Sequence, residues 1–423
     1  MVYDIGFLIF SIFYLPALIF KGKLHGDFHE RFGIYSEAKR ALLSAAKDVI
    51  WIQAVSVGEV ALCRGLISLL KKEFPGRDIV LSTITRRGNE LAKILFSNEA
   101  VIIYFPLDFS LVVRKAVSLI RPKLYIMIET EIWPNVLREL SLKAVPAALL
   151  NGRISDRSFG QYRLARPFLL KTLGRIRLFC MQSKEDGRRI MEMGATADRV
   201  RVTGTMKFDF DVAADDGAAR RMRGSLGLSE DAELFVAGST HPGEEGTVVS
   251  AYSQLLKEFP KLTLLIAPRH VERAGEVEAA VKRSGLSAVR VSSLGGSQVT
   301  SDKPLVYILD TIGRLNDAYA VATLVFIGGS LVPHGGQNPI EPASFEKPVI
   351  FGPHMSNFRA IAAVLLDSGG AVQVKDAREL LDKARALLKD PQAGLALGRN
   401  ARRAIIENRG ATGRNLKALK EII

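Results

Sequence analysis

The sequence predicts an α/β protein with two tandem Rossmann-like domains, each built on a doubly wound sheet, behind a short hydrophobic segment. Its 423 residues exceed what a single hydrophobic core normally supports. Short apolar runs alternate with helical stretches in two successive series, which is typical of doubly wound sheets. Residues 211–230 separate the two series, because they are rich in Asp, Arg and Gly and poor in large apolar side chains. We therefore expect a membrane-anchoring segment over 1–22, a first domain over 23–210 and a second over 211–423.

The predicted strands are continuous apolar runs, as expected for parallel strands that are buried on both faces. In the first series they cover residues 49–54, 79–83, 101–105, 124–128, 145–150, 178–181 and 200–203. In the second series they cover residues 234–237, 262–267, 289–292, 305–309, 324–327, 349–351 and 371–374. No G-x-G-x-x-G follows the first strand and no P-loop is present, which disfavours a dinucleotide-dependent dehydrogenase or an NTPase.

Positive charge is concentrated in the first half of the chain. The net charge is +14, and residues 1–210 contain 32 Lys and Arg against 20 Asp and Glu, whereas the remainder contains 26 against 24. This asymmetry favours an anionic partner for the first half, such as a membrane surface, a phosphorylated lipid or nucleic acid. Solubility alone is the alternative explanation.

The first 20 residues are almost entirely apolar, with Asp4 as their only charge. The negative charge and the lack of a small-residue cleavage site are unlike a secretory signal, so we expect a retained anchor. Pro16 interrupts the run, which is barely long enough to span a bilayer. Lys21 and Lys23 follow at once, and the positive-inside bias then places the rest of the chain in the cytoplasm. A helix lying in the membrane interface, or one packed on the protein itself, remains an alternative.

Three carboxylates follow predicted strands of the first domain. Glu59 lies in the first turn of the helix after the first strand, behind Gly58, where it could act as a general base. A first-turn Glu that interacts with the helix dipole is an equally good interpretation of Glu59. Glu129 and Glu131 directly follow the fourth strand, where carboxylates are unfavourable without partners. Glu129 is better placed to face a ligand, and Glu131 could serve as a capping residue.

Basic residues mark the end of the first domain. Residues 151–180 contain seven basic side chains against one acidic one, interleaved with aromatic residues, and they include Arg153 and Arg157. This pattern suits a phosphorylated amphiphile or a membrane surface, although a solvated helix face is the alternative. No usual nucleic-acid-binding module is visible, so we expect no nucleic-acid partner. Lys207, near the domain boundary, could reach a phosphate, or it could be an ordinary surface lysine.

The second domain contains three turns that could bind an anion, over residues 238–245, 268–270 and 328–342. The first turn opens a helix, and the second carries an arginine. The third is rich in glycine and leads to Asn338 as a helix N-cap, Pro339 at the first helical position and Glu341. The structural interpretation is simply a good helix start. The functional interpretation is a phosphate- and ribose-binding segment, with Glu341 on the ribose hydroxyls.

Together these blocks resemble one family, the 3-deoxy-D-manno-octulosonic acid (Kdo) transferases of lipopolysaccharide synthesis. The resemblance covers essentially the whole chain, including the order and spacing of the blocks. The matching segments are 56–59, 129–135, Asn151 with 153–158, 207–209, 239–245, 268–270, 328–331 and 335–341.

The resemblance implies a two-domain GT-B-type glycosyltransferase fold, with CMP-Kdo as donor and a lipid A precursor (lipid IVA) as acceptor, at the cytoplasmic face of the inner membrane. It implies that Glu59 is the catalytic base and that Glu129 and Lys207 stabilise the transition state. It also implies contacts to CMP from three segments, which are Pro268 with Arg269, Ile312-Gly313-Arg314, and Asn338-Pro339-Ile340-Glu341. The chain departs from the family pattern at Gln337, where many members have His, and at Arg314, where some have Glu. The side chain of Arg314 is therefore the weakest of these assignments.

A single displacement assisted by one base would invert the anomeric centre. Because a CMP-linked sugar departs with one phosphate rather than a pyrophosphate, we expect neither a metal ion nor any other cofactor. Cys63 and Cys180, the two cysteines, are expected to be buried thiols. Two alternatives remain at this stage, which are another nucleotide-sugar enzyme of the same fold, such as an epimerase, and a non-enzymatic membrane-surface scaffold.

Overall fold

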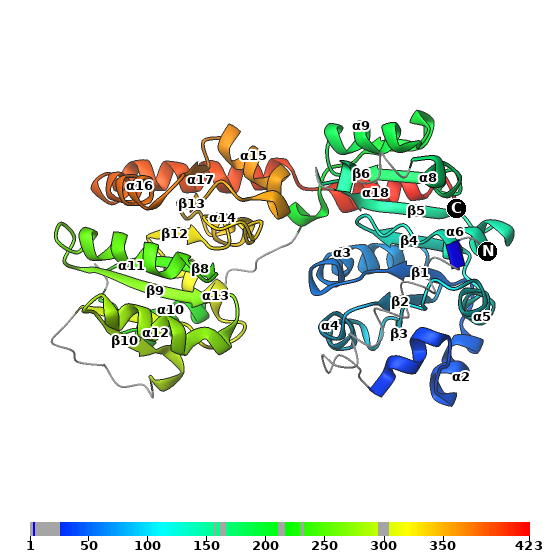
Figure 1. Cartoon of the computed structure of the whole chain (residues 1–423), viewed down its shortest axis with the longest axis horizontal. Helices are drawn as coiled ribbons and strands as arrows, with labels where there is room; N and C mark the ends of the chain where they lie inside the picture. Colours follow the sequence, from blue (N-terminus) through cyan, green and yellow to red (C-terminus); the bar gives the residue numbers. More distant parts are fainter. Residues whose placement is uncertain are drawn as a thin grey trace. The chain divides into compact units, whose positions relative to one another are not determined.

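The computed structural model describes residues 3–4, 26–155, 158–160, 166–209, 216–229, 232–294 and 304–423. The chain forms two compact units. Unit 1 comprises Met1–Phe210 with Gly410–Ile423, and unit 2 comprises Asp211–Arg409. Each unit is built around a seven-stranded parallel sheet with helices against it (Figure 1). The prediction of two α/β domains with parallel sheets is therefore confirmed.

The sheet of unit 1 has the strand order β3-β2-β1-β4-β5-β6-β7. Its first three strands run outward to one edge and the next four to the other, so the order reverses between β1 and β4. The strands are β1 (Ile50–Gln53), β2 (Ile79–Thr83), β3 (Val101–Tyr104), β4 (Leu124–Ile128), β5 (Ala147–Gly152), β6 (Leu178–Met181) and β7 (Val200–Val202).

Short loops connect these strands to the helices of unit 1. The helices are η1 (Gly26–Phe32), α2 (Glu37–Ala45), α3 (Val57–Glu73), α4 (Arg86–Phe96), α5 (Ser110–Ile120), α6 (Pro134–Leu142), α8 (Arg166–Leu173), α9 (Lys184–Met193), η2 (Ala197–Arg199), η3 (Met206–Asp209) and α18 (Ala411–Leu419). Successive residues of the strands point to opposite faces, so Trp51 and Tyr125 join one core cluster while Ile50 and Ile52 join the other. Both faces of the sheet are thus buried, as the continuous apolar runs predicted.

The sheet of unit 2 has the order β10-β11-β9-β8-β12-β13-β14, so β8 lies between β9 and β12. The strands are β8 (Glu233–Thr240), β9 (Leu262–Pro268), β10 (Ser287–Arg290), β11 (Leu305–Ile308), β12 (Leu324–Ile327), β13 (Val349–Phe351) and β14 (Ala371–Gln373). The helices are α10 (Asp216–Ser225), α11 (Glu244–Leu255), η4 (Val271–Arg273), α12 (Ala274–Arg283), η5 (Val291–Ser293), α13 (Leu315–Val321), α14 (Ile340–Ser344), η6 (Ser356–Phe358), α15 (Arg359–Asp367), α16 (Ala377–Lys389) and α17 (Pro391–Glu407).

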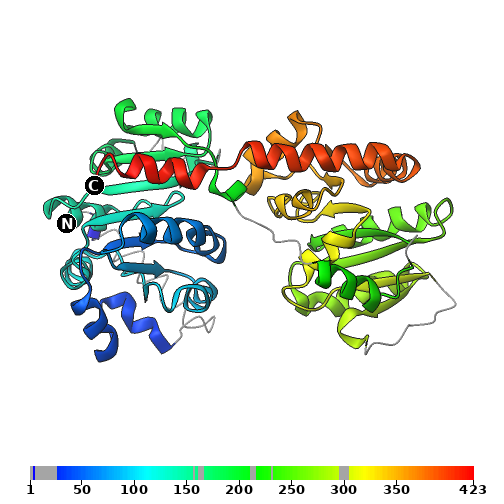
Figure 2. The same ribbon diagram turned by 180° about the vertical axis from the view of Figure 1, so that it is seen from behind.

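The last helix corrects the expected assignment of residues 211–423 to the second domain. After α17 the chain leaves unit 2, and α18 packs on unit 1 against α3 and β6 (Figures 1 and 2). Ala411, Leu416 and Leu419 are buried in the same core cluster as the apolar side chains of α3. Nothing in the local sequence of residues 411–419 showed which of the two domains they cover.

The predicted anchor over 1–22 lies outside the described residues, apart from Tyr3 and Asp4. The Asp4 carboxylate accepts hydrogen bonds from the backbone N–H and the hydroxyl of Ser110, at 3.0 and 2.7 Å, and from the Asn135 amide at 2.8 Å. Asp4 is thus bound to the first turns of α5 and α6. Within the part of the chain that the structure describes, no helix has both the length and the apolarity to cross a bilayer.

Candidate active site

The predicted carboxylates of unit 1 follow two adjacent strands at the point where the strand order reverses. Glu59 lies in the first turn of α3, which follows β1, and Glu129 and Glu131 follow β4. The carboxyl ends of strands on either side of such a reversal form the ligand-binding crevice of doubly wound sheets. The fold therefore brings these three carboxylates to the position where a ligand site is expected.

Glu59 is held in place by the turn before its own helix. Its Oε2 accepts a hydrogen bond from the Val55 backbone N–H at 2.6 Å, and its Oε1 accepts one from the Ser56 hydroxyl at 2.9 Å. Ser56 is the N-cap of α3, and Glu59 reaches back over the cap much as the acidic residue of a capping box does. Glu59 therefore has the structural role that the sequence allowed for a Glu in the first helical turn, and the same contacts orient its carboxylate.

The electrostatic surroundings of Glu59 suit a proton acceptor. Burial raises its pKa to about 7, and the negative charge of Glu129 adds to that shift. The hydrogen bonds from Val55 and Ser56 and the charge of Lys207 act in the opposite direction. A carboxylate with a pKa near neutral pH is a stronger base than an ordinary Glu, yet a large fraction of it is ionised at pH 7.

Glu129 pairs with the predicted basic residue. The Lys207 ammonium lies 3.4 Å from Glu129 Oε1, and both side chains are largely shielded from solvent. Glu129 also has a φ of 58°, in the left-handed region that non-glycine residues seldom adopt. Backbone strain of this kind persists where the surrounding structure holds it, and it clusters at functional sites. Lys207 is thus not an ordinary surface lysine, because it contributes the positive charge beside these carboxylates.

Lys207 lies on η3, and two contacts hold this short helix. The backbone N–H of Met206 donates to Oδ1 of buried Asn151, the penultimate residue of β5, which has a φ of 55°. On the other side of Lys207, the Asp209 carboxylate accepts hydrogen bonds from the Gly410 N–H at 2.5 Å and from the Thr412 N–H and hydroxyl, both at 2.6 Å. Asp209 therefore caps the N-terminus of α18, and the end of the chain anchors the loop that carries Lys207.

Glu131 completes a group of three carboxylates and packs beside aromatic rings. Burial raises its pKa to about 7, with a further contribution from the charge of Glu59. Its Oε2 accepts a hydrogen bond from the Trp133 indole N–H at 3.1 Å. The Trp133 ring in turn packs on Phe105, with ring centroids 5.4 Å apart. Glu131 does not act as the helix cap that the sequence allowed, because α6 begins at Pro134 without a side-chain cap.

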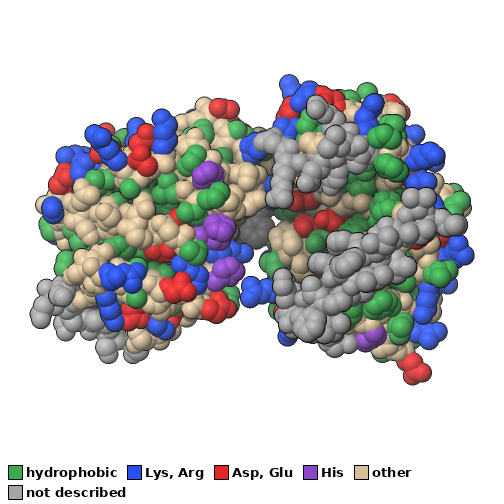
Figure 3. All heavy atoms as spheres, in the orientation of Figure 1, with side chains coloured by type: hydrophobic (Ala, Val, Ile, Leu, Met, Phe, Trp, Pro, Cys, Tyr) green, Lys and Arg blue, Asp and Glu red, His purple; other side chains and the backbone are tan. Residues whose placement is uncertain are grey.

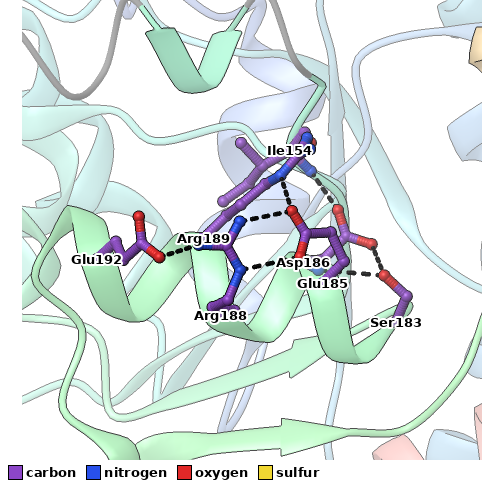
Figure 4. Close-up of polar contacts among 7 residues, drawn as sticks. All are labelled: Ile154, Ser183, Glu185, Asp186, Arg188, Arg189 and Glu192. Carbon is purple, nitrogen blue, oxygen red and sulfur yellow. Dashed lines mark hydrogen bonds and ion pairs between the residues drawn. The ribbon is translucent and has the colours of Figure 1, made fainter.

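Arg153 lies in the loop after β5, next to the carboxylate group. Thr130, which separates Glu129 from Glu131, accepts a hydrogen bond from the Arg153 N–H at 3.2 Å and donates one to the Arg153 carbonyl. Figure 4 shows how α9 fixes the following residue, since Asp186 accepts from the Ile154 N–H at 2.7 Å and Arg189 donates to the Ile154 carbonyl at 2.7 Å. The predicted partner Arg157 lies outside the described residues.

In unit 2, the predicted donor-binding residues follow β11, β9 and β12, and β8 lies between β9 and β12 in the sheet. Pro268 ends β9 and Arg269 follows it, Ile312-Gly313-Arg314 follow β11, and Asn338-Pro339-Ile340-Glu341 follow β12. The Arg269 guanidinium has no hydrogen-bond or ion-pair partner among the described residues. Its charge lowers the pKa of the Glu341 carboxyl, although burial raises that pKa more strongly.

The third predicted turn is less suited to binding an anion than the sequence indicated. Helix α14 begins at Ile340 and has only five residues, so Pro339 rather than Asn338 occupies the N-cap. Asn338 is used locally, because its Oδ1 accepts the Ile340 N–H at 3.1 Å and its amide donates to Glu341 Oε1 at 3.0 Å. In the β11 segment, Ile312 is 86% exposed, Gly313 has a φ of 87°, and Arg314 pairs with Asp317 at 3.3 Å.

The glycine-rich part of the third turn, 328–331, is already occupied by a carboxylate of the protein. Fully buried Glu244 accepts hydrogen bonds from the N–H groups of Gly329 at 2.6 Å and of Ser330 and Leu331, both at 3.0 Å. It also accepts from the His241 N–H at 2.9 Å. A Cβ at Gly328 would lie 2.4 Å from the Ser239 carbonyl oxygen, so this glycine is required by packing. Glu244 therefore occupies the N–H groups of residues 329–331, while the predicted phosphate- and ribose-binding helix start at Asn338–Glu341 stays a prediction.

Two of these residues were not singled out by the sequence analysis. Asp209 and Glu244 both lie in segments that carried the family resemblance, yet neither was assigned a role. Each carboxylate binds backbone N–H groups of a segment far away in the sequence. Such partners can be recognised only in the folded chain.

Solved structures with this fold include enzymes of different activity. A glycosyltransferase from Rickettsia africae is 15% identical, with a TM-score of 0.63, and the match covers 89% of this chain and 98% of that one. A UDP-GlcNAc 2-epimerase from Neisseria meningitidis is 12% identical, with a TM-score of 0.59, and the match covers 88% of this chain and 99% of that one. At these identities the likeness shows the fold alone.

The sequence comparisons are more specific. Residues 26–210 match the family described as 3-deoxy-D-manno-octulosonic-acid transferase (kdotransferase). The 3-deoxy-D-manno-octulosonic acid transferase of Haemophilus influenzae is 33% identical over 393 residues, which cover 92% of this chain and 90% of that protein. The chain belongs to the 3-deoxy-D-manno-octulosonic acid transferase family of glycosyltransferases.

Proposed function

We propose that the protein transfers Kdo from CMP-Kdo to a sugar hydroxyl of a lipid A precursor, lipid IVA, in lipopolysaccharide synthesis. The observation that carries this proposal is the group formed by Glu59, Glu129 and Lys207 at the strand-order reversal of unit 1. It provides a base and a compensating ammonium where a doubly wound sheet binds its ligand. Membership of the Kdo transferase family supports the choice of sugar.

In the proposed reaction, Glu59 removes the proton of the acceptor hydroxyl as the oxygen attacks the anomeric carbon of Kdo. The bond from that carbon to the CMP phosphate breaks, and CMP leaves with the bonding electrons. One displacement with one base inverts the anomeric centre. The hydrogen bonds from Val55 and Ser56 hold the Glu59 carboxylate in one orientation, which reduces the reorganisation needed for proton transfer.

We assign the Lys207–Glu129 pair to stabilising the transition state. Lys207 supplies positive charge close to the reacting groups, and Glu129 fixes the position of the ammonium. In unit 2, the unpartnered Arg269 is the strongest candidate for binding the CMP phosphate, because the amides of 329–331 are occupied. Glu341 and Asn338 remain candidates for ribose recognition, and Pro268, Pro339, Ile340 and the segment Ile312-Gly313-Arg314 for contacts to CMP.

The proposed overall arrangement is of the GT-B type, with unit 1 for the acceptor and unit 2 for the donor. The excess of basic residues in 1–210, including Arg153 and Arg157, would favour a bisphosphorylated lipid at the cytoplasmic face of the inner membrane. The residues 1–22 would provide the membrane anchor. No metal ion or cofactor is assigned a role, since the leaving group carries a single phosphate, whose charge a basic side chain can balance.

The proposal is tested by incubating the protein with CMP-Kdo, generated in situ, and a tetra-acylated, bisphosphorylated lipid A precursor. Mass spectrometry of the lipid should show products heavier by one or more Kdo units. The Arg269→Ala variant should bind CMP at least about 10-fold more weakly in calorimetry, because a charged contact is lost. Release of CMP without a change in lipid mass would exclude this acceptor, and no reaction of any kind would exclude the donor as well.

A further inference from the structure

Three histidines of unit 2 follow three adjacent strands at the same edge of the sheet. His270 follows β9, His241 follows β8, and His334 follows β12, and β8 lies between the other two strands. The carboxyl ends of parallel strands meet at one edge, and this edge carries the ligand in doubly wound domains. Histidine side chains are seen to gather on unit 2 in the space-filling view (Figure 3). The family resemblance assigned no role to any of the three.

The three imidazoles form a compact cluster. The rings of His241 and His334 are stacked, with centroids 4.3 Å apart and planes inclined by 19°. His270 approaches His241 edge-on, with centroids 6.4 Å apart. Gln337 fixes the orientation of His241, because its amide nitrogen lies 3.1 Å from His241 Nε2. Stacked rings do not aim their nitrogens at a common point, and the described residues contain no group of three side chains suited to a metal ion.

The cluster lies beside two arginines, and Glu341 is an acidic side chain on which the charge of Arg269 acts. Burial lowers the pKa of His241, and neighbouring His334, His270 and Arg269 lower it further. A fourth neighbour, Arg273, is already neutralised by Glu245 at 2.8 Å and by Glu276 at 2.9 Å. Arg269, in contrast, has no ion-pair partner among the residues that the structure describes. An added anion would therefore be bound favourably here.

Three backbone N–H groups beside the cluster are not available to bind such an anion. The amides of Gly329, Ser330 and Leu331, which lie beside the cluster, are occupied by the buried Glu244 carboxylate. An anion beside these three amides would need other donors, and the exposed imidazole of His334 and the half-buried imidazole of His241 lie there.

We propose that His241 and His334 form the binding site for the carboxylate of the sugar acid in the donor. This inference rests on the proposed function. An ulosonic acid linked to CMP carries its carboxylate and its phosphate on the same anomeric carbon, so the two anionic groups lie close together. Arg269 would bind the phosphate and the two imidazoles the carboxylate beside it. The pair would then distinguish a nucleotide-linked sugar acid from CMP alone and from a neutral nucleotide sugar.

The test compares the affinity for freshly prepared CMP-Kdo with the affinity for CMP, by calorimetry of the full chain without acceptor. His334→Gln and His241→Gln should each weaken CMP-Kdo binding about 10-fold or more, because a charged hydrogen bond is lost. The affinity for CMP should change less than about 2-fold, which also verifies that the variants are folded. His29→Gln, a change of an exposed histidine of unit 1, serves as the matched control and should alter neither affinity.

Three outcomes would overturn the carboxylate site. The first is that the wild-type protein binds CMP-Kdo no more tightly than CMP. The second is that the variants bind both ligands more weakly by the same factor, and the third is that they bind both as tightly as the wild type does. The transfer assay is read separately. If the wild-type protein prefers CMP-Kdo through these histidines but transfers no Kdo to lipid, the site stands and the proposed acceptor fails.

Discussion

The Nζ atom of Lys207 lies 3.4 Å from Oε1 of Glu129, and this ion pair connects the loop after β7 with the loop after β4. Glu129 adopts a φ of 58° at this point, and Lys207 lies on a short helix that is fixed from both sides. The positive charge of Lys207 lowers the pKa of the Glu59 carboxyl. The ion pair therefore affects the pKa of the Glu59 carboxyl and also fixes the position of the Lys207 ammonium.

Replacing Lys207 by Met should slow transfer by on the order of 100- to 1,000-fold, because charge that develops in the transition state loses its partner. The pH profile should change as well. Lys207 lowers the pKa of Glu59, so the variant should require a higher pH to ionise the base, and the acid limb of kcat/KM should move to higher pH. The measurement is kcat/KM for transfer between pH 5 and 9.

Lys72→Met, on the exposed side of α3, is the control for this experiment and should leave the profile unchanged. A Lys207→Met enzyme whose acid limb coincides with that of the wild type would show that Lys207 does not act on the base.

Asp209→Ala should reduce both stability and turnover. The carboxylate caps α18 through Gly410 and Thr412, and loss of such a cap costs about 1–2 kcal/mol. Turnover should fall beyond what the loss of folded protein explains, because η3 and Lys207 are no longer anchored. Asp209→Asn, which retains one acceptor oxygen, should recover part of both losses. Urea unfolding and kcat are the two measurements, and an unstable variant with unchanged kcat would limit Asp209 to a structural role.

Glu131→Gln should change how stability depends on pH. Burial raises the folded-state pKa of Glu131 from its usual 4.5 to about 7. The stabilisation due to this shift is fully present below pH 4.5 and is lost as the pH rises through 7. The Gln variant has no such loss, so its unfolding free energy should decline less between pH 5 and pH 8 than that of the wild type. Parallel curves for the two proteins would contradict the shift.

Glu244→Ala should destabilise unit 2 by at least about 3 kcal/mol, because four backbone N–H groups, two of them in buried hydrogen bonds, lose their acceptor. Glu244→Gln keeps one carbonyl oxygen as an acceptor, so it should lower the free energy of unfolding less than Glu244→Ala does. Urea unfolding followed by circular dichroism measures both. If Glu244→Ala instead unfolds like the wild type and binds CMP more tightly, the turn at 328–331 is a phosphate site after all.

The sequence was sufficient to predict the strands, because each central strand is a run of apolar residues with its own turn signals. Strands β2, β4, β6, β12 and β13 have the predicted bounds, while β5 ends two residues later, at Gly152. That shift brings Asn151 into the strand, where it supports Met206. The sequence placed Glu59 after the first strand and Glu129 after the fourth, and the structure shows that these strands, β1 and β4, are neighbours.

Long-range partners were beyond the reach of the sequence. Local patterns show that α18 is amphipathic and that Gly329 lies in a tight turn. They do not identify unit 1 as the surface on which α18 packs, or Glu244 as the carboxylate that binds the N–H groups of the turn. The glycine-rich turn and helix start over 328–342 were predicted to bind a phosphate and a ribose, because free N–H groups at a helix start attract anions. Buried Glu244, at the start of α11, accepts the hydrogen bonds of the N–H groups of residues 329–331 instead.

The central claim is that Glu59 removes the acceptor proton, and the most direct measurement is Kdo transfer by Glu59→Gln alongside its affinity for CMP. We predict that turnover falls by at least about 100-fold, since Gln cannot accept the proton, while CMP binds as in the wild type. We also predict that wild-type kcat/KM falls as the pH drops below about 7, where Glu59 becomes protonated. A Glu59→Gln enzyme with near-wild-type turnover would contradict the assignment of Glu59 as the base.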